Sequence, residues 1–241
     1  MNRPERRNAL SLEMMTEMLA ALDRVAADPA AHVLVIEGRG PAFSAGHDLV
    51  EMTSNREAEF YATLFETCVQ LMTRVHELPQ PVIARVHGVA TAAGCQLVAA
   101  CDLAIASTEA TFATPGVNIG LFCSTPMVPV ARAVGNKRAL ELLFTGESIG
   151  ARTAFEWGLV NKVVSGDRLD EEVDALARRI ADASPAVVAL GKRAFYAQDR
   201  LAEPAAYDIA APAMVENAQY DDAHEGMRAF LEKRAPRWRT R

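Results

Sequence analysis

The stretch that decides the fold reads Gly88-Val89-Ala90-Thr91-Ala92-Ala93-Gly94-Cys95-Gln96-Leu97. It follows the apolar run Val82 to Val86, which predicts a buried strand, and it continues into a short helix predicted for Ala93 to Cys101. The first amides of such a helix have no partner inside the helix and carry partial positive charge. They can receive an anion or a developing negative charge, although small residues at a helix start are also consistent with tight packing alone.

A second segment of the same character lies upstream and reads Phe43-Ser44-Ala45-Gly46-His47-Asp48-Leu49. It comes after a strand predicted for His32 to Ile36 and after the backbone break at Gly38-Arg39-Gly40-Pro41. Each of the two loops therefore follows a predicted strand, and each is rich in small residues that permit close backbone approach. This pair of loops is the first candidate for a functional site.

The rest of the chain alternates strand and helix in its first half and is mainly helical in its second half. Ser11 predicts the cap of a helix that runs to about Ala27. Apolar residues at three- and four-residue spacing between Phe60 and Met72 predict a second helix that ends before Pro79. Further strands are predicted for Leu103 to Ala106, for Thr111 to Ala113 and, within the helical region beyond Ser124, for Leu159 to Val164. This order predicts an α/β domain with a helical C-terminal part.

The composition predicts a soluble protein with a large core. Half of the 241 residues are apolar, no apolar run approaches the roughly 20 residues of a membrane helix, and Met1 to Pro4 does not begin a signal peptide. The net charge of −6 argues against general nucleic-acid binding, and the basic tail 233–241 is either a solvated end or a phosphate contact. The four cysteines form no C-x-x-C pair, which predicts buried thiols in a reducing compartment and hence a cytoplasmic location.

Motifs of other enzyme classes fail on their context. The segment 146–150 matches the G-x-S-x-G elbow of serine hydrolases, but that elbow needs a strand before the serine, and Lys137 to Phe144 has a helical pattern. Gly146 is instead predicted to end that helix, and Ser148 to cap the next one. The two His-Glu pairs lack the second histidine of a zinc-protease motif, and no phosphate-binding glycine loop is present. We therefore predict no metal and no permanently bound cofactor.

The two loops and the opening segment Asn2 to Leu10 resemble the enoyl-CoA hydratase/isomerase (crotonase) family, almost from end to end of the chain. Phe43 to Leu49 looks like the family's first oxyanion loop and Ala92 to Asp102 like its second, while Ala113 to Pro126 is similar to one branch of the family. The resemblance implies a crotonase-type spiral of β-β-α units over residues 1–185. It also implies a helical C-terminal trimerisation region over residues 186–241, in a homotrimer or a hexamer made of two trimers.

The resemblance further implies a strand ahead of the opening segment. We therefore expect either that the true start lies upstream of Met1 or that the next strand is an exposed edge.

An acyl-CoA thioester is the substrate that the resemblance implies, with its carbonyl oxygen on the backbone N–H groups of His47 and Ala93. Such donors stabilise negative charge that develops on the oxygen, and the loss of one costs about 3 kcal/mol. Coenzyme A enters only as part of the substrate. The positions matched to its contacts are Ser44, Ala45, Asp48 and Leu49 in the first loop, Arg6 and Arg7 in the opening segment, and Phe230 and Lys233 near the C-terminus, where they would reach a neighbouring subunit's ligand.

The acid/base positions of the family are altered in this sequence. Family hydratases use two glutamates, and the matching positions here are Gln96 and Gly116; a carboxylate used by some other members corresponds to Ser124. None of these groups titrates near neutral pH, and general acid–base catalysis typically contributes 10²–10⁴-fold per group. The structural alternatives are a satisfied helix amide for Gln96, a turn glycine after Pro115, and a helix N-cap for Ser124.

Three further side chains carry alternative interpretations. The ring of His47 could titrate beside the expected carbonyl, or it could simply pack. Asp48 and Asp102 are predicted to bond backbone amides. The leading hypothesis is an acyl-CoA enzyme of the family with altered acid/base groups. The alternative is a catalytically silent acyl-CoA-binding or assembly protein, and serine hydrolysis through Ser148 is a third hypothesis.

Overall fold

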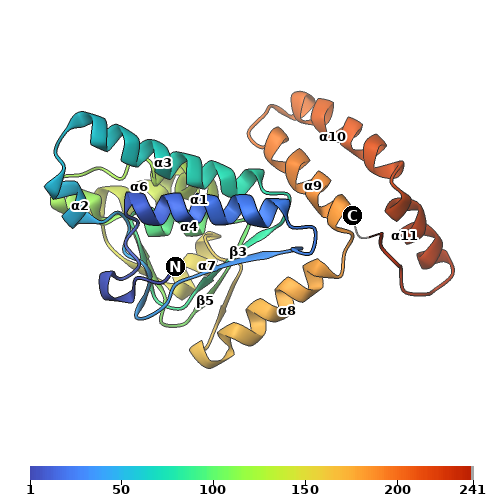
Figure 1. The fold of residues 1–241 in the computed structure, drawn as a ribbon, viewed down its shortest axis with the longest axis horizontal. Coiled ribbons are helices and arrows are strands. Elements are labelled where there is room, and N and C mark those ends of the chain that lie inside the picture. The colour runs from blue at the N-terminus through green and yellow to red at the C-terminus, as the bar shows by residue number, and fades with distance from the viewer. Residues whose placement is uncertain (240–241) are drawn as a thin grey trace.

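The fold is an α/β spiral followed by a group of helices that extends to one side of it (Figure 1). It is described by a computed structural model in which residues 1–239 are placed. The spiral contains β1 (Leu34–Glu37), β2 (Ala42–Ser44), β3 (Val82–Val86), β4 (Val89–Thr91), β5 (Leu103–Ser107), β6 (Thr111–Ala113), β7 (Ile149–Gly150) and β8 (Lys162–Val164). Its helices are α1 (Leu12–Ala27), α2 (Leu49–Ser54), α3 (Ala58–Glu77), α4 (Ala93–Ala100), α5 (Met127–Val134), α6 (Asn136–Thr145), α7 (Ala151–Trp157) and α8 (Leu169–Ala181).

The first six strands alternate between two sheets. One sheet has the order β1-β3-β5-β8 and is parallel throughout; the other has the order β2-β4-β6-β7, with only the last pair antiparallel. Each of the first three turns thus gives one strand to each sheet before a helix crosses back, which is the predicted spiral of β-β-α units. As a result, the loops that follow β2 and β4 lie side by side, because these two strands pair in parallel, with a register shift between Ala42 and Ser44.

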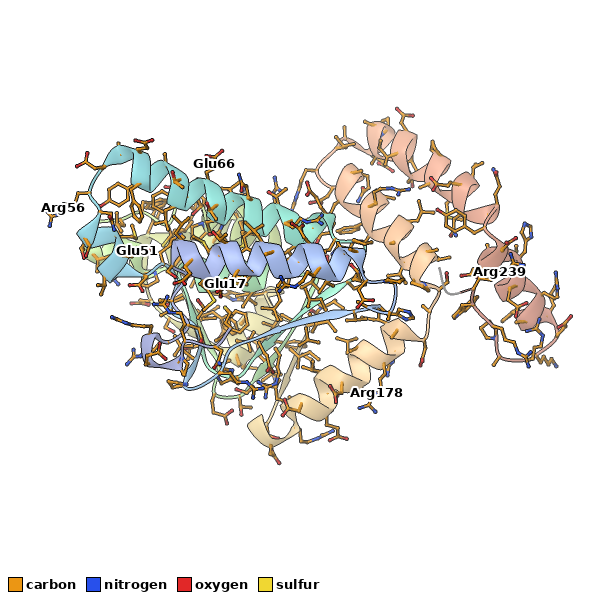
Figure 2. The ribbon with its side chains drawn as sticks, in the orientation of Figure 1. Glu17, Glu51, Arg56, Glu66, Arg178 and Arg239 are labelled. Carbon is orange, nitrogen blue, oxygen red and sulfur yellow. The ribbon has the colours of Figure 1, made fainter. Side chains whose placement is uncertain are left out.

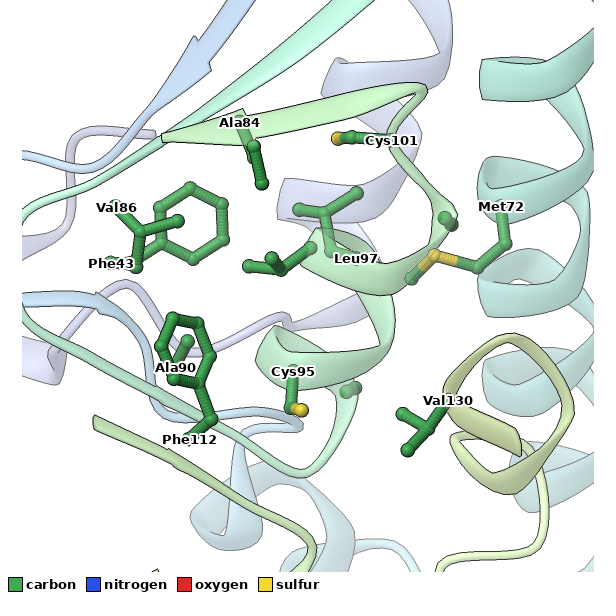
Figure 3. Packing of buried hydrophobic residues seen from close by; sticks show 14 of the residues in the cluster. Phe43, Met72, Ala84, Val86, Ala90, Cys95, Leu97, Cys101, Phe112 and Val130 are labelled. Atoms are coloured by element: carbon green, nitrogen blue, oxygen red, sulfur yellow. The ribbon is translucent and has the colours of Figure 1, made fainter. Parts of the chain in front are cut away.

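Helix α4 lies at the centre of the core. All but one of its residues are buried, and Figure 3 shows Leu97 of this helix among Phe43, Val86 and Phe112 from three strands. The helix contains no charged residue, so it can be surrounded by apolar side chains without burying an unpaired charge. The position of its first turn is therefore fixed by the whole core.

The structure confirms most of the predicted elements. Ser11 caps α1 by accepting a hydrogen bond from Met14 N at 3.2 Å, and the predicted bounds of β3 and β6 are those observed. Strands β2, β4 and β7 were not predicted, because each has only two or three residues and shows no alternation of polar and apolar side chains. The expected strand over 159–164 shortens to β8, and the strand over 32–36 shifts to β1.

The prediction for Gly146 is confirmed and that for Ser148 is wrong. Gly146 ends α6 in the left-handed conformation, with φ of 65°. Ser148 caps no helix, because Ile149–Gly150 first pairs with β6 and Gly150 then precedes α7. The exposed serine therefore follows a helix and precedes a strand, which is the reverse of a nucleophile elbow.

The C-terminal helices are α9 (Pro185–Gln198), α10 (Glu203–Ala218) and α11 (Asp221–Leu231), and α10 buries none of its residues. Of these, α9 is joined to the core by a charged network. Lys192 Nζ contacts Asp102 Oδ2 at 2.7 Å and also donates to two carbonyl oxygens of the core. Tyr196 donates to the other oxygen of Asp102 at 2.7 Å, and Val82 N donates to Asp102 at 2.6 Å, which confirms Asp102 as a structural aspartate.

Within residues 1–239, none of the helices combines the length and the apolar character needed to cross a bilayer.

The Lys192–Asp102 pair gives a stability prediction. We expect Lys192→Met to lower the free energy of unfolding by about 3 kcal/mol, because it leaves a largely buried carboxylate without its cation. Arg178→Met is the control, since Arg178 forms an exposed pair with Asp174 at the surface of α8 (Figure 2) and should cost less than about 0.5 kcal/mol. Urea unfolding measures both, and equal losses would contradict the anchoring role.

Candidate active site

A cavity of about 460 Å³ lies where the loops after β2 and β4 face the segment 115–126 that follows β6. The first loop contributes Ala45, His47 and Leu49, and the second contributes Ala92 and Ala93. Met52 of α2 and Phe65 of α3 close one wall. The lining is mainly hydrocarbon, which suits an acyl group and makes any polar contact inside it strong.

Two glycines lock the loops together. A Cβ on Gly94 would lie 2.3 Å from the carbonyl oxygen of Ser44, and a Cβ on Gly46 would lie 2.8 Å from Ala92 Cβ and 3.2 Å from Ala93 N. Gly46 also has φ of 87°, a conformation that favours glycine. Any side chain at either position would push the loops apart, so the close approach of the two backbones depends on these glycines.

Ala92 has a strained backbone at the start of α4. Its φ of 50° and ψ of −119° belong to a region that is normally occupied by glycine, and such strain costs on the order of 1–3 kcal/mol. The residue is held by a hydrogen bond from its N–H to Ala113 O at 2.9 Å, while its own carbonyl accepts from Gln96 N at 3.0 Å. The strained turn leaves the next N–H, that of Ala93, at the open end of the helix.

The N–H groups of His47 and Ala93 are both free at this cavity. In the part of the chain that the structure describes, neither donates to a side chain or to a backbone carbonyl outside its own element. A hydrogen bond from Thr91 Oγ1 to Ala45 O, at 3.2 Å, joins the loops directly beside them. Two unpaired donors from adjacent loops at one apolar cavity are the arrangement that an oxyanion hole requires.

The other polar residues of the first loop bond protein groups outside the cavity. Ser44 is buried and donates to Asn8 O at 2.9 Å, and Asp48 caps α2 by accepting from Val50 N and Glu51 N. The prediction that Asp48 bonds backbone amides is therefore confirmed. Neither Ser44 nor Asp48 lines the cavity, whereas Ala45 and Leu49 do.

The His47 ring packs against its neighbours, and neither of its nitrogens is exposed to the cavity. Its Nδ1 lies 3.3 Å from Leu10 O, so this nitrogen carries the proton, and Nε2 is buried without a partner among residues 1–239. Burial lowers the pKa of the ring, which keeps it neutral at neutral pH. Its edge-to-face contact with Phe65, at a centroid distance of 5.4 Å, fits the packing interpretation of this side chain.

The three altered acid/base positions lie in different environments. Gln96 is only 2% exposed and does not line the cavity; its Oε1 lies 3.7 Å from the Cys68 thiol. Gly116 does line the cavity, but a Cβ there would lie 2.5 Å from Leu121 O and 2.8 Å from Cys123 Sγ. The space next to Gly116 is thus filled by these two groups, so a glutamate at this position would not fit the loop.

Ser124 lies exposed at the rim of the cavity. Its expected role as a helix N-cap is wrong, because α5 begins after Pro126 and the serine hydroxyl donates weakly to Phe122 O, at 3.4 Å. The first amides of α5 bond backbone carbonyls instead: Met127 N donates to Cys123 O at 3.0 Å and Val128 N to Thr125 O at 3.3 Å.

Within one chain, only some of the residues predicted to contact coenzyme A lie near the cavity. Arg6 and Arg7 are exposed near the first loop, where Arg7 O accepts from Ala45 N at 3.0 Å. Phe230 is 83% exposed on α11, and Figure 1 shows that helix at the far end of the molecule from the loops, with Lys233 just beyond it. Within a single chain, Phe230 and Lys233 therefore cannot reach this cavity.

Sequence reasoning missed several residues of the cavity wall, among them Met52, Phe65 and Cys123. Phe65 was assigned only to the apolar face of a helix and Cys123 only to the buried thiols. Cys123 could have been found from its position just after the turn that follows Gly116. Leu121 N donates to Gly116 O at 2.9 Å, and this turn brings the chain back to the cavity.

The spiral fold with two glycine-locked loops at one cavity defines a crotonase-type protein. The family model described as enoyl-CoA hydratase/isomerase matches residues 1–241, and the chain belongs to this family. A relative from Danio rerio, enoyl-CoA hydratase domain-containing protein 3, mitochondrial, is 48% identical over 99% of this chain and 82% of its own length. The segment 113–126 predicted membership of this branch of the family, and the prediction is confirmed.

Solved structures agree with this assignment. An enoyl-CoA hydratase from Mycobacterium smegmatis has a TM-score of 0.96 at 47% identity, and covers 98% of this chain and 92% of its own. The human enoyl-CoA hydratase domain-containing protein 3 has a TM-score of 0.95 at 48% identity, with 98% and 95% of the two chains covered. The predicted fold class, with its helical C-terminal part, is confirmed.

The predicted cytoplasmic location is wrong according to the same comparisons. The relatives from Danio rerio, Rattus norvegicus and Homo sapiens all carry mitochondrial in their names. The prediction rested on free cysteines, and all four are indeed free and buried. Buried thiols indicate only that no disulfide forms, so they do not distinguish one reducing compartment from another.

The glycine lock can be tested by adding one methyl group. We expect Gly94→Ala to destabilise the fold by about 1–3 kcal/mol and to separate the loops, because its Cβ would overlap the Ser44 carbonyl. Gly191→Ala in α9 is the matched control: nothing lies within 4 Å of the added Cβ, so it should stabilise by about 0.4–1 kcal/mol. Thermal or urea unfolding measures both, and a neutral Gly94→Ala would refute the lock.

Proposed function

We propose that this protein binds an acyl-CoA thioester with the carbonyl oxygen on the N–H groups of His47 and Ala93. The observation that carries the proposal is the pair of unpaired amides at one apolar cavity, in loops locked by Gly46 and Gly94. A thioester oxygen gains negative charge when its α carbon becomes nucleophilic, and preorganised donors stabilise that charge without having to reorient. The site would therefore stabilise a thioester enolate.

The names of the relatives support an enzyme of the hydratase type, but we expect hydration by the two-glutamate route to be very slow. Gln96 contacts Cys68 instead of the cavity, and the position of Gly116 has no room for a carboxylate side chain. Ser124 has only a neutral hydroxyl at the rim. Without a group that takes a proton from water, the typical 10²–10⁴-fold contribution of each base is missing.

The alternative function is a catalytically silent acyl-CoA-binding or assembly protein. One observation favours it, namely that the cavity has two free donors while the acid/base positions hold neutral groups. Under either function, Ala45 and Leu49 would contact the pantetheine end of the ligand, because they line the cavity. Arg6 and Arg7 would contact its phosphates, because Arg7 O bonds Ala45 N beside the cavity.

The binding proposal is tested by replacing the amide of Ala93 with an ester, which removes one N–H and leaves the side chain unchanged. We expect the affinity for butyryl-CoA and any thioester turnover to fall, the turnover by about 10²–10³-fold, since one oxyanion donor is lost. Isothermal titration and mass spectrometry of the products measure the two effects. The same replacement at Val188, whose N–H bonds Ser184 O in α9, is the control for loss of a backbone hydrogen bond.

Turnover of crotonyl-CoA distinguishes efficient hydration from the two functions considered above. Loss of enoyl absorbance at the rate of an efficient hydratase would refute our argument from Gln96 and Gly116. Binding of thioesters without any product would favour the silent alternative, and no binding of any thioester would overturn both functions.

We also propose that the chain assembles as a homotrimer, or as a hexamer of two trimers, through residues 186–241. Support comes from α10, whose apolar residues are all at least partly exposed, including Tyr207, Met214 and Val215. Phe230 and Leu231 of α11 are more than three-quarters exposed as well. Apolar patches of this kind mark interaction surfaces, and a second chain would also bring its Phe230 and Lys233 within reach of a neighbour's ligand.

Light scattering after size exclusion tests the assembly. We expect three or six times the mass of the chain, and we expect the double variant Met214→Glu, Val215→Glu to dissociate, because two charges would be desolvated in the interface. Gln70→Glu adds an exposed charge on α3 and should leave the mass unchanged. A monomeric wild-type protein would contradict the proposal.

A further inference from the structure

One residue of the loop after β4 has a backbone conformation that its side chain disfavours. Ala92 has φ of 50° and ψ of −119°, close to the angles of the first central position of a type II′ turn, where glycine is the usual residue. Arg7 also has positive φ, but its ψ of 39° belongs to the ordinary left-handed region. Ala92 lies outside that region, and its side chain has no polar atom that could compensate by hydrogen bonding.

Backbone hydrogen bonding does not explain why an alanine occupies this position. The N–H of Ala92 donates to Ala113 O at 2.9 Å, and its carbonyl accepts from Gln96 N at 3.0 Å. A glycine would form both bonds and would adopt the same angles without strain. Strained backbone of this kind is found mostly at functional sites, so the role of the residue lies in the contacts of its methyl group.

The methyl group of Ala92 packs on the first loop. A Cβ on Gly46 would lie 2.8 Å from Ala92 Cβ, so the methyl group occupies the space beside the Cα of Gly46. Ala92 is also half-buried and lines the cavity. Among the non-glycine residues with positive φ within residues 1–239, it alone does so. The strained residue is thus the one that touches both the opposite loop and the space proposed for the ligand.

Attraction and steric contact oppose each other between the two loops. The hydrogen bond from Thr91 Oγ1 to Ala45 O, at 3.2 Å, draws the first loop toward the second. The methyl group of the next residue, Ala92, meets Gly46 and limits this approach. Each of these two residues immediately precedes one of the two proposed donor amides. The methyl group therefore lies where it can fix the separation of the two N–H groups.

We infer that Ala92 is a positioning residue, whose methyl group is a spacer against Gly46 that holds the N–H groups of His47 and Ala93 at the separation a thioester oxygen requires. The inference rests on the proposed binding of an acyl-CoA thioester. Hydrogen bonds weaken steeply as their angle and length depart from the optimum, so two donors act on one oxygen only when their separation is fixed. The strain at Ala92 is the cost of keeping this spacer.

Removal of the methyl group should change stability and ligand polarisation in opposite directions. We expect Ala92→Gly to raise the Tm of the full chain by about 2–4 °C, because the backbone strain is relieved. The same variant should bind butyryl-CoA about two- to tenfold more weakly, the effect of weakening one hydrogen bond. With ¹³C at the thioester carbonyl, the wild-type protein should shift the carbonyl NMR signal downfield by polarising the C=O bond, and Ala92→Gly should shift it less.

Two further variants separate the spacer from the strain. Ala92→Ser keeps the β carbon, so it should keep the wild-type carbonyl shift. Arg200→Gly removes another positive φ, of 72°, at an exposed position beyond α9, where the side chain makes only exposed contacts with Asp199 and Arg132 O. Relief of strain there should leave the carbonyl shift and the affinity unchanged. A loss of the shift in Arg200→Gly, or a loss in Ala92→Ser as large as that in Ala92→Gly, would contradict the spacer role.

The outcomes distinguish this inference from the function on which it rests. If the wild-type protein binds and polarises butyryl-CoA and Ala92→Gly does so equally well, the spacer role is wrong and the proposed function stands. A lower Tm in Ala92→Gly would also overturn the inference, since the residue would then carry no strain that glycine relieves. No binding of the thioester by the wild-type protein overturns both.

Discussion

The contact on which the site depends is the close approach of two backbones, one at Gly46 and the other at Gly94. Added side-chain carbons at these positions would overlap a carbonyl oxygen of the opposite loop or a methyl group. The two free amides belong to the residues adjacent to this contact, His47 after Gly46 and Ala93 before Gly94. Steric contact, rather than a hydrogen bond, therefore sets how far apart the two donors can lie, and the apolar cavity raises the electrostatic effect of each.

Two networks hold the loops so that this contact persists. On the first loop, Leu10 N donates to Gly46 O at 2.7 Å, and Asn8 Nδ2 donates to two carbonyls at its base, those of Arg39 and Ala42, at 2.8 Å. On the second loop, the strain at Ala92 is maintained by pairing with β6 and by the burial of α4 behind it. Strained backbone persists only when its surroundings fix it, and here they do so on both sides.

The sequence predicted the long elements and the two loops, but not the way they meet. Periodicity over α1 and α3 and the apolar run of β3 reflect burial that extends over many residues, so local pattern suffices. The strands β2 and β4 have three residues each, and their pairing is a property of the whole spiral. The resemblance to the family supplied positions 47 and 93, yet the turning of Gln96 toward Cys68 depends on packing that no local pattern records.

The same steric argument applies to the acid/base positions, where the surrounding loop as well as the side chain excludes a carboxylate. At Gly116 the space that a side chain would need is filled by other groups, Leu121 O and Cys123 Sγ. They are brought there because the 3₁₀ turn Pro115–Ile119 ends at Gly120, with φ of 79°, and the chain then turns back. A glutamate cannot be restored there without rebuilding the turn. What remains at the cavity is the main-chain part of the site, the two amides, so under the proposed function the protein would stabilise charge on the thioester oxygen without moving a proton of its own.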